Sequence, residues 1–94
     1  VSGLVDSSTD AETVARIQQL LADIDGIEEV NSLKTRVFGA SAYADVTIKV
    51  DGAMTVEEGH DIATLAHNKI EANLPKIKHI MVHIEPMDQD HPHP

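Results

Sequence analysis

Apolar residues recur at intervals of three and four along the first part of the chain, from Thr9 to about Asp25. This spacing predicts an amphipathic helix. Thr9 or Asp10 can cap its start, with Glu12 completing a capping box, and Gly26 stands at the expected C-terminal cap. The residues that form the apolar stripe are Val14, Ile17, Leu20, Leu21 and Ile24.

From Val30 the period changes from 3.6 to 2, which predicts two strands on either side of a tight turn at residues 39–41. In the first strand, Leu33, Thr35 and Val37 face one way and Lys34, Arg36 and Phe38 face the other. In the second, Ala44, Val46, Ile48 and Val50 alternate with Tyr43, Asp45, Thr47 and Lys49. The pattern indicates a β-hairpin with one apolar face and one mixed polar face.

A second helix and a third strand complete the pattern. Thr55 and Glu58 form a capping box for a helix that runs to about Leu74, before Pro75. Its expected buried stripe consists of Val56, Ala63, Ala66, Ile70 and Leu74. The last strand ends at Pro86 and carries Ile80, Val82 and Ile84 on one side, with His79, Met81, His83 and Glu85 on the other.

These elements predict an α+β fold in the order αββαβ, a two-layer sandwich in which both helices cover one face of a three-stranded sheet. The length of 94 residues suits one domain, which we place at residues 9–86. We interpret residues 1–8 as a linker from a preceding segment, and residues 87–94 as a disordered tail rich in His and Pro. The second face of the sheet stays uncovered.

Composition narrows the possible functions. One Tyr, one Phe and no Trp argue against a deep ligand pocket, and no nucleophile, phosphate-loop or metalloprotease motif indicates an enzyme. Sixteen acidic against seven basic residues give a net charge of -9, which repels nucleic acid and attracts cations. Without cysteine, any metal site would have to use imidazole and carboxylate ligands.

The uncovered sheet face is where we expect a partner. An exposed face of this kind in a small domain most often pairs two copies of the chain, so we expect a homodimer. Its interface or secondary metal-binding candidates are Tyr43, Thr47, His79 and Met81.

Some residues of the chain could bind a metal ion, although each has a plainer interpretation. His83 and Glu85 point the same way from one strand, with Cα atoms roughly 6.5 to 7 Å apart. Two ligands fall short of the three or four that zinc needs, so their spacing alone favours ordinary solvated side chains. Asp45 is, by itself, more typical of a solubilising charge, and His67 of a polar residue bordering the core. His60, near the start of the second helix, lies on the flank of its buried stripe.

Five short motifs, in order and at matching intervals, resemble the C-terminal cytoplasmic domain of cation diffusion facilitator transporters. Some members of this family are associated with magnetosome iron transport. The motifs are Gly3-Leu4-Val5-Asp6, Ile24-Asp25-Gly26-Ile27, Leu33-Lys34-Thr35-Arg36, residues 55–60 and residues 82–86. The resemblance covers nearly the whole chain.

The resemblance implies a ferredoxin-like, metallochaperone-like fold and a V-shaped homodimer attached to a transmembrane domain. It implies a place on the cytoplasmic side of a membrane, either a bacterial inner membrane or a magnetosome membrane. In the family, a divalent metal ion such as zinc, iron or manganese draws the two arms together and favours transport. The alternative is a structural dimerisation module in which metal binding is incidental.

Matching the motifs residue by residue makes His60, His83, Glu85 and Asp45 the expected metal ligands. Asn31 and Thr47 stand where other members have histidines, so the chain departs from a full binuclear zinc site.

Overall fold

The computed structural model describes residues 11–87, apart from the side chain of Phe38. Its elements are α1 (Ala11–Ala22), β1 (Glu29–Phe38), β2 (Ser41–Val50), α2 (Val56–Asn73) and β3 (Ile77–Pro86). The predicted αββαβ order is therefore confirmed. The linker at 1–8, the cap at Thr9 or Asp10, and the tail beyond Met87 lie outside the described residues.

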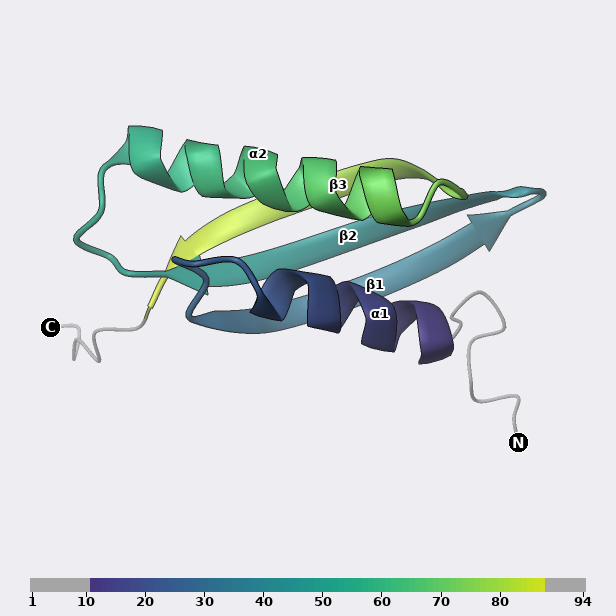
Figure 1. Ribbon diagram of the computed structural model, residues 1–94, viewed down its shortest axis with the longest axis horizontal. Helices are drawn as coiled ribbons and strands as arrows, with labels where there is room; N and C mark the ends of the chain where they lie inside the picture. The colour runs from purple at the N-terminus through teal and green to yellow at the C-terminus, as the bar shows by residue number, and fades with distance from the viewer. Residues whose placement is uncertain (1–10, 88–94) are drawn as a thin grey trace, which may run out of the picture.

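The three strands form one sheet in the order β1-β2-β3. β1 and β2 pair antiparallel as the predicted hairpin, and β2 and β3 pair in parallel. Parallel neighbours need a crossover connection, which α2 provides. Both helices lie on the same side of the sheet (Figure 1), so the predicted two layers are confirmed.

The core lies between the two layers and is aliphatic. β2, the central strand, buries Ala44, Val46, Ile48 and Val50 on its helix-facing side, as the alternation predicts. α1 contributes the fully buried Ile17 and Leu21, and α2 contributes Ile70. Each large side chain removed from water in this way stabilises the fold by about 1.5–3 kcal/mol.

The start of α2 follows the sequence prediction closely. The Thr55 hydroxyl accepts a hydrogen bond from the Glu58 amide at 3.0 Å, and the Glu58 carboxylate accepts one from the Thr55 amide at 2.9 Å. This reciprocal box satisfies two amides at the helix start and fixes where α2 begins. No helix between residues 11 and 87 is long and apolar enough to cross a membrane.

Three details of the sequence prediction are wrong. α1 ends at Ala22, not Asp25, because the chain then turns through hydrogen bonds from Ile24 N to Leu21 O and from Ile27 N to Ile24 O. Val56 is 90% exposed because the first turn of α2 begins outside the contact with the sheet. Val37 is 47% exposed because the tip of the hairpin extends past both helices (Figure 1).

Gly26 is required where α1 turns into β1, and its replacement tests this junction. Gly26 has a φ of 101°, and an added Cβ would lie 2.5 Å from Ile62 Cδ1. We expect Gly26→Ala to lower the free energy of unfolding by about 2–5 kcal/mol, from backbone strain and overpacking together. Urea denaturation followed by circular dichroism measures this change.

Gly39→Ala is the matched control. Gly39 also has a positive φ, of 62°, but nothing lies within 4 Å of an added Cβ. Its substitution should cost only the backbone term of about 1–2 kcal/mol. Equal losses in the two variants would show that the Ile62 contact does not restrict position 26.

Candidate functional site on the open sheet face

We refer to the sheet face that points away from the two helices as the open face. No described segment covers it (Figure 1). The strand register places Tyr43 beside His79, Asp45 beside Met81, and Thr47 beside His83. Glu85 follows at the next position, opposite Lys49. The alternation in the sequence therefore identified the members of this face correctly.

Asp45 and His83 are in direct contact across β2 and β3. His83 Nε2 lies 3.1 Å from Asp45 Oδ1, and the two side chains are 50% and 58% exposed. The contact is diagonal, because the direct neighbour of His83 on β2 is Thr47. Diagonal positions on neighbouring strands are within reach of long side chains.

A polar cavity of about 470 Å³ surrounds this pair. Glu85 and Thr47 also line it, so a second carboxylate and a hydroxyl border the Asp45–His83 contact. Two ligand atoms bound at about 2.0–2.1 Å to one tetrahedral zinc ion are about 3.3 Å apart. The separation of Nε2 and Oδ1 is close to that value, so a small change of rotamer would let both atoms bind one cation.

His60 does not join this group. It lies exposed on α2, in the helical layer, and the described residues offer it no hydrogen bond or ion pair with the other three candidates. Within residues 11–87, no three His, Asp or Glu side chains converge closely enough to hold a metal ion. One copy of the chain thus presents a pair of ligand atoms with Glu85 nearby, rather than a complete site.

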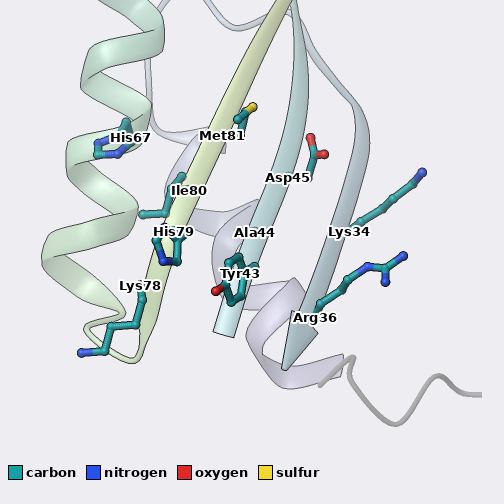
Figure 2. Close-up of a pocket in the computed structure, with 10 residues that line it drawn as sticks. All are labelled: Lys34, Arg36, Tyr43, Ala44, Asp45, His67, Lys78, His79, Ile80 and Met81. Atoms are coloured by element: carbon teal, nitrogen blue, oxygen red, sulfur yellow. The ribbon is translucent and has the colours of Figure 1, made fainter. Parts of the chain in front are cut away.

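A second, larger cavity of about 550 Å³ adjoins the first (Figure 2). Its basic and imidazole side chains come from β1, β3 and α2: Lys34, Arg36, His67, Lys78 and His79. Tyr43 stacks on His79 with ring centroids 4.5 Å apart and an interplanar angle of 18°. We name this the cationic cavity.

Sequence reasoning missed the cationic cavity, although part of its signal was present. Lys34 and Arg36 alternate away from the core, and hairpin pairing brings them beside Asp45 and Tyr43. His67 was interpreted as a polar residue bordering the core, whereas it also lines this cavity from the helical layer. Only the packing of α2 against β3 places it there.

Comparison with known proteins identifies one family. Residues 9–87 match the family model described as "Cation efflux protein, cytoplasmic domain". Metal tolerance protein C1 of Arabidopsis thaliana is 30% identical to this chain. The match covers 88% of this chain and 18% of that protein. The manganese efflux system protein MneP of Bacillus subtilis is 24% identical to this chain. The match covers 92% of this chain and 29% of that protein.

The magnetosome protein MamB of Magnetospirillum gryphiswaldense is also 24% identical, over 92% of the chain and 29% of its own length. The chain thus spans less than a third of each of these relatives. Two of these relatives are thus named for metal tolerance and manganese efflux, and the third for the magnetosome.

Solved structures show the same fold. A nickel form of a MamM CTD variant superposes with a TM-score of 0.80 at 24% identity, covering 84% of this chain and all of that one. Another MamM CTD variant gives a TM-score of 0.78 at 26% identity, covering 81% of this chain and 95% of that one. The predicted α+β architecture is confirmed by this likeness.

Proposed function

The chain belongs to the cation efflux protein family as its cytoplasmic domain, and from that premise we propose that it is the dimeric, metal-binding regulatory domain of a divalent-cation transporter. The family domain is a dimerisation domain of membrane transporters. The observation that carries the metal-binding part is the contact between His83 Nε2 and Asp45 Oδ1 on an exposed sheet face.

The ligand chemistry supports a borderline divalent cation. Imidazole nitrogen and carboxylate oxygen together suit zinc, iron or manganese, and the chain contains no cysteine that would favour Cu(I). Asp45 and His83 would supply two bonds, and Glu85 is the nearest candidate for a third from the same cavity. Two solved MamM CTD variants, in nickel and copper forms, support metal binding by this fold.

A second copy of the chain would complete the site. Zinc-like ions need three or four protein ligands, and one copy presents a contacting pair with Glu85 beside it. The open face carries exposed Tyr43 and Met81 close to Asp45, as expected for a face that another copy approaches. Two-fold symmetry would then bring two ligand pairs toward each other.

Metal binding between two copies would act as a switch. Each 94-residue copy carries a net charge of -9, so the two arms repel when they approach. A divalent cation relieves this repulsion and adds ligand bonds only in the closed arrangement. The cation therefore shifts the dimer toward the closed arrangement. The size of the shift depends on how much more tightly the cation binds the closed arrangement than the open one. In the whole transporter, closure on the cytoplasmic side would favour transport.

His60 is proposed as the ligand of a separate, peripheral position. It lies exposed near the start of α2, away from the Asp45–His83 contact. Such a residue could bind a metal ion only with ligands from other elements or from a partner. Its removal should therefore affect metal binding less than removal of His83.

The alternative function is a structural dimerisation module in which metal binding is incidental. The exposed apolar side chains Tyr43 and Met81 support it, because they favour association without any ion. The two functions differ in what metal does to the shape of the dimer.

Substitution at the contacting pair tests the metal site. We expect Asp45→Asn and His83→Ala each to weaken zinc or manganese binding at least about tenfold, because each removes a direct ligand. Isothermal titration calorimetry on metal-free protein measures the affinity. Asp51→Asn is the matched control: it removes one carboxylate outside this cavity and should leave the affinity within about twofold.

The same titrations can rank the other two candidates. Glu85→Gln should weaken binding by less than His83→Ala, and His60→Ala should have the smallest effect of the four. Unchanged affinity in both Asp45→Asn and His83→Ala would exclude the pair as the primary site.

Acidification should release the metal ion. Imidazole and carboxylate bind metal only in their unprotonated forms, so protons compete with the cation. The affinity should fall progressively as the pH is lowered from about 7.5 to 5.5, where free imidazole becomes protonated. Calorimetry across this range checks the direction, and an affinity that rises at low pH would contradict an imidazole ligand.

Small-angle scattering distinguishes the switch from the structural module. Adding zinc or manganese to the wild-type dimer should reduce its radius of gyration, because the arms close around the ion. The Asp45→Asn, His83→Ala double variant should stay dimeric and show no change. A wild-type profile that does not respond to a bound metal ion would favour the structural module.

A further inference from the structure

A small cavity lies at the end of the domain where the turn between β1 and β2 extends past both helices (Figure 1). Its volume is about 150 Å³. The start of α1, the end of the hairpin and the turn before β3 all contribute to its lining, which includes Thr13, Val37, Ala40, Ala42, Lys76 and Ile77. We refer to it as the hairpin-end cavity.

Val37 is the large apolar side chain that the helices leave uncovered at this end. It shares a face of β1 with Thr35, because residues two apart on a strand point the same way. Thr35 is 5% exposed, whereas Val37 is 47% exposed. An aliphatic side chain on the helix-facing side of the sheet is thus half open to water. A further segment that covered Val37 would gain the free energy of apolar burial.

The hairpin-end cavity has room for one aliphatic side chain. An apolar cavity of about 150 Å³ engineered in another protein holds a benzene molecule, which is similar in size to the side chain of Leu. Ile77, which is 3% exposed, gives the cavity an apolar wall. Ala40 and Ala42 contribute only methyl groups, and for this reason space remains between the hairpin and α1.

The segment that precedes α1 is within reach of this cavity. α1 begins at Ala11, and Thr13 in its first turn lines the cavity. Leu4 and Val5 are the large apolar residues nearest before the helix, seven and six positions from Ala11. A chain of six or seven residues spans up to about 20–25 Å. This pair can therefore lie over the end of the sheet at which α1 starts.

Charge favours the same segment. Lys76 lines the cavity, and among residues 11–87 it has no ion pair within 4.0 Å. Asp6 directly follows Leu4 and Val5 in the sequence. A segment that places this apolar pair on the cavity would bring the Asp6 carboxylate toward the Lys76 ammonium, where the two charges attract.

We propose that Leu4 and Val5 dock onto the hairpin-end cavity of their own chain, where they cover Val37 and fill the cavity while Asp6 approaches Lys76. The docked segment extends the helical layer over the end of the sheet that α1 and α2 leave bare. It acts as a strap that fixes the direction in which the chain enters the domain.

This inference is independent of the proposed metal site. None of the residues that line the hairpin-end cavity borders the cavity around Asp45 and His83. Failure of the strap would leave the metal site standing, and the reverse is also true.

A nitroxide spin label tests where the segment lies. The chain contains no cysteine, so Ser2→Cys provides a single attachment point beside the segment. In the docked arrangement the label should broaden the amide resonances of Val37 and Ala42, and leave that of Val56 at the opposite end of the domain sharp. The same label on a Leu4→Ser, Val5→Ser variant should lose most of this broadening.

A mixed sample separates docking within one chain from docking between two copies. Isotope-labelled protein without nitroxide is mixed with protein of natural isotopic abundance that carries the nitroxide. Docking within one chain leaves the resonances of Val37 and Ala42 in the isotope-labelled protein sharp. Broadening of these resonances in the mixture would show that the segment of a second copy occupies the cavity, and would overturn the proposal.

Amide hydrogen exchange measures the protection that docking provides. The Ala42 amide donates to Lys76 O at 3.3 Å and the Ile77 amide donates to Leu74 O at 2.9 Å, so both amides report on opening of the cavity. The Leu4→Ser, Val5→Ser variant should exchange both amides at least about threefold faster, relative to the Ile48 amide in the central strand.

Val56→Ser, Leu65→Ser is the matched control. It removes the same two kinds of side chain from α2, where Val56 is 90% exposed and Leu65 is 52% exposed. The exchange of Ala42 and Ile77 relative to Ile48 should stay within about 1.5-fold of the wild-type value, because this control leaves the hairpin-end cavity unchanged.

Two further results would overturn the proposal. One is a labelled wild-type chain in which the resonances of Val37 and Ala42 stay as sharp as that of Val56. The other is an equal acceleration of exchange in the two double variants, because that result would assign the effect to lost apolar surface in general rather than to docking at this cavity.

Discussion

Burial of one face of β2 is the constraint on which the rest of the structure depends. The four helix-facing side chains of this strand, Ala44, Val46, Ile48 and Val50, are nearly or fully removed from water. Since neighbouring residues of a strand point to opposite faces, this burial obliges Tyr43, Asp45, Thr47 and Lys49 to face away from the core. A register shift of one residue would exchange the two sets. The hydrophobic core thus determines which side chains are available for binding.

This dependence explains how much could be predicted from the sequence. Period-two alternation assigns the residues of the open face on β2 and β3, and capping chemistry locates the start of α2 at Thr55. Both are local signals. The end of α1, the exposure of Val56 and the exposure of Val37 depend on where one layer stops covering the other. The packing of whole helices and strands determines that extent, and no short sequence pattern predicts it.

The candidate site likewise has some features that local sequence predicts and others that need the assembled fold. The sequence identifies Asp45 and His83 as open-face residues, but it cannot place them diagonally across β2 and β3, because this needs the parallel register. The family motifs add His60, and the fold puts it in the other layer. The cationic cavity draws side chains from three elements, so its charge becomes visible only when β1, β3 and α2 are assembled. Composition alone, with its net charge of -9, indicates the opposite sign.

The two cavities are physically connected through Lys34 and Asp45, which border both. Lys34 lies directly opposite Asp45 on the neighbouring strand, so its ammonium would repel a metal ion bound at Asp45. The proposed metal site would have to offset this repulsion with more negative charge than one carboxylate supplies.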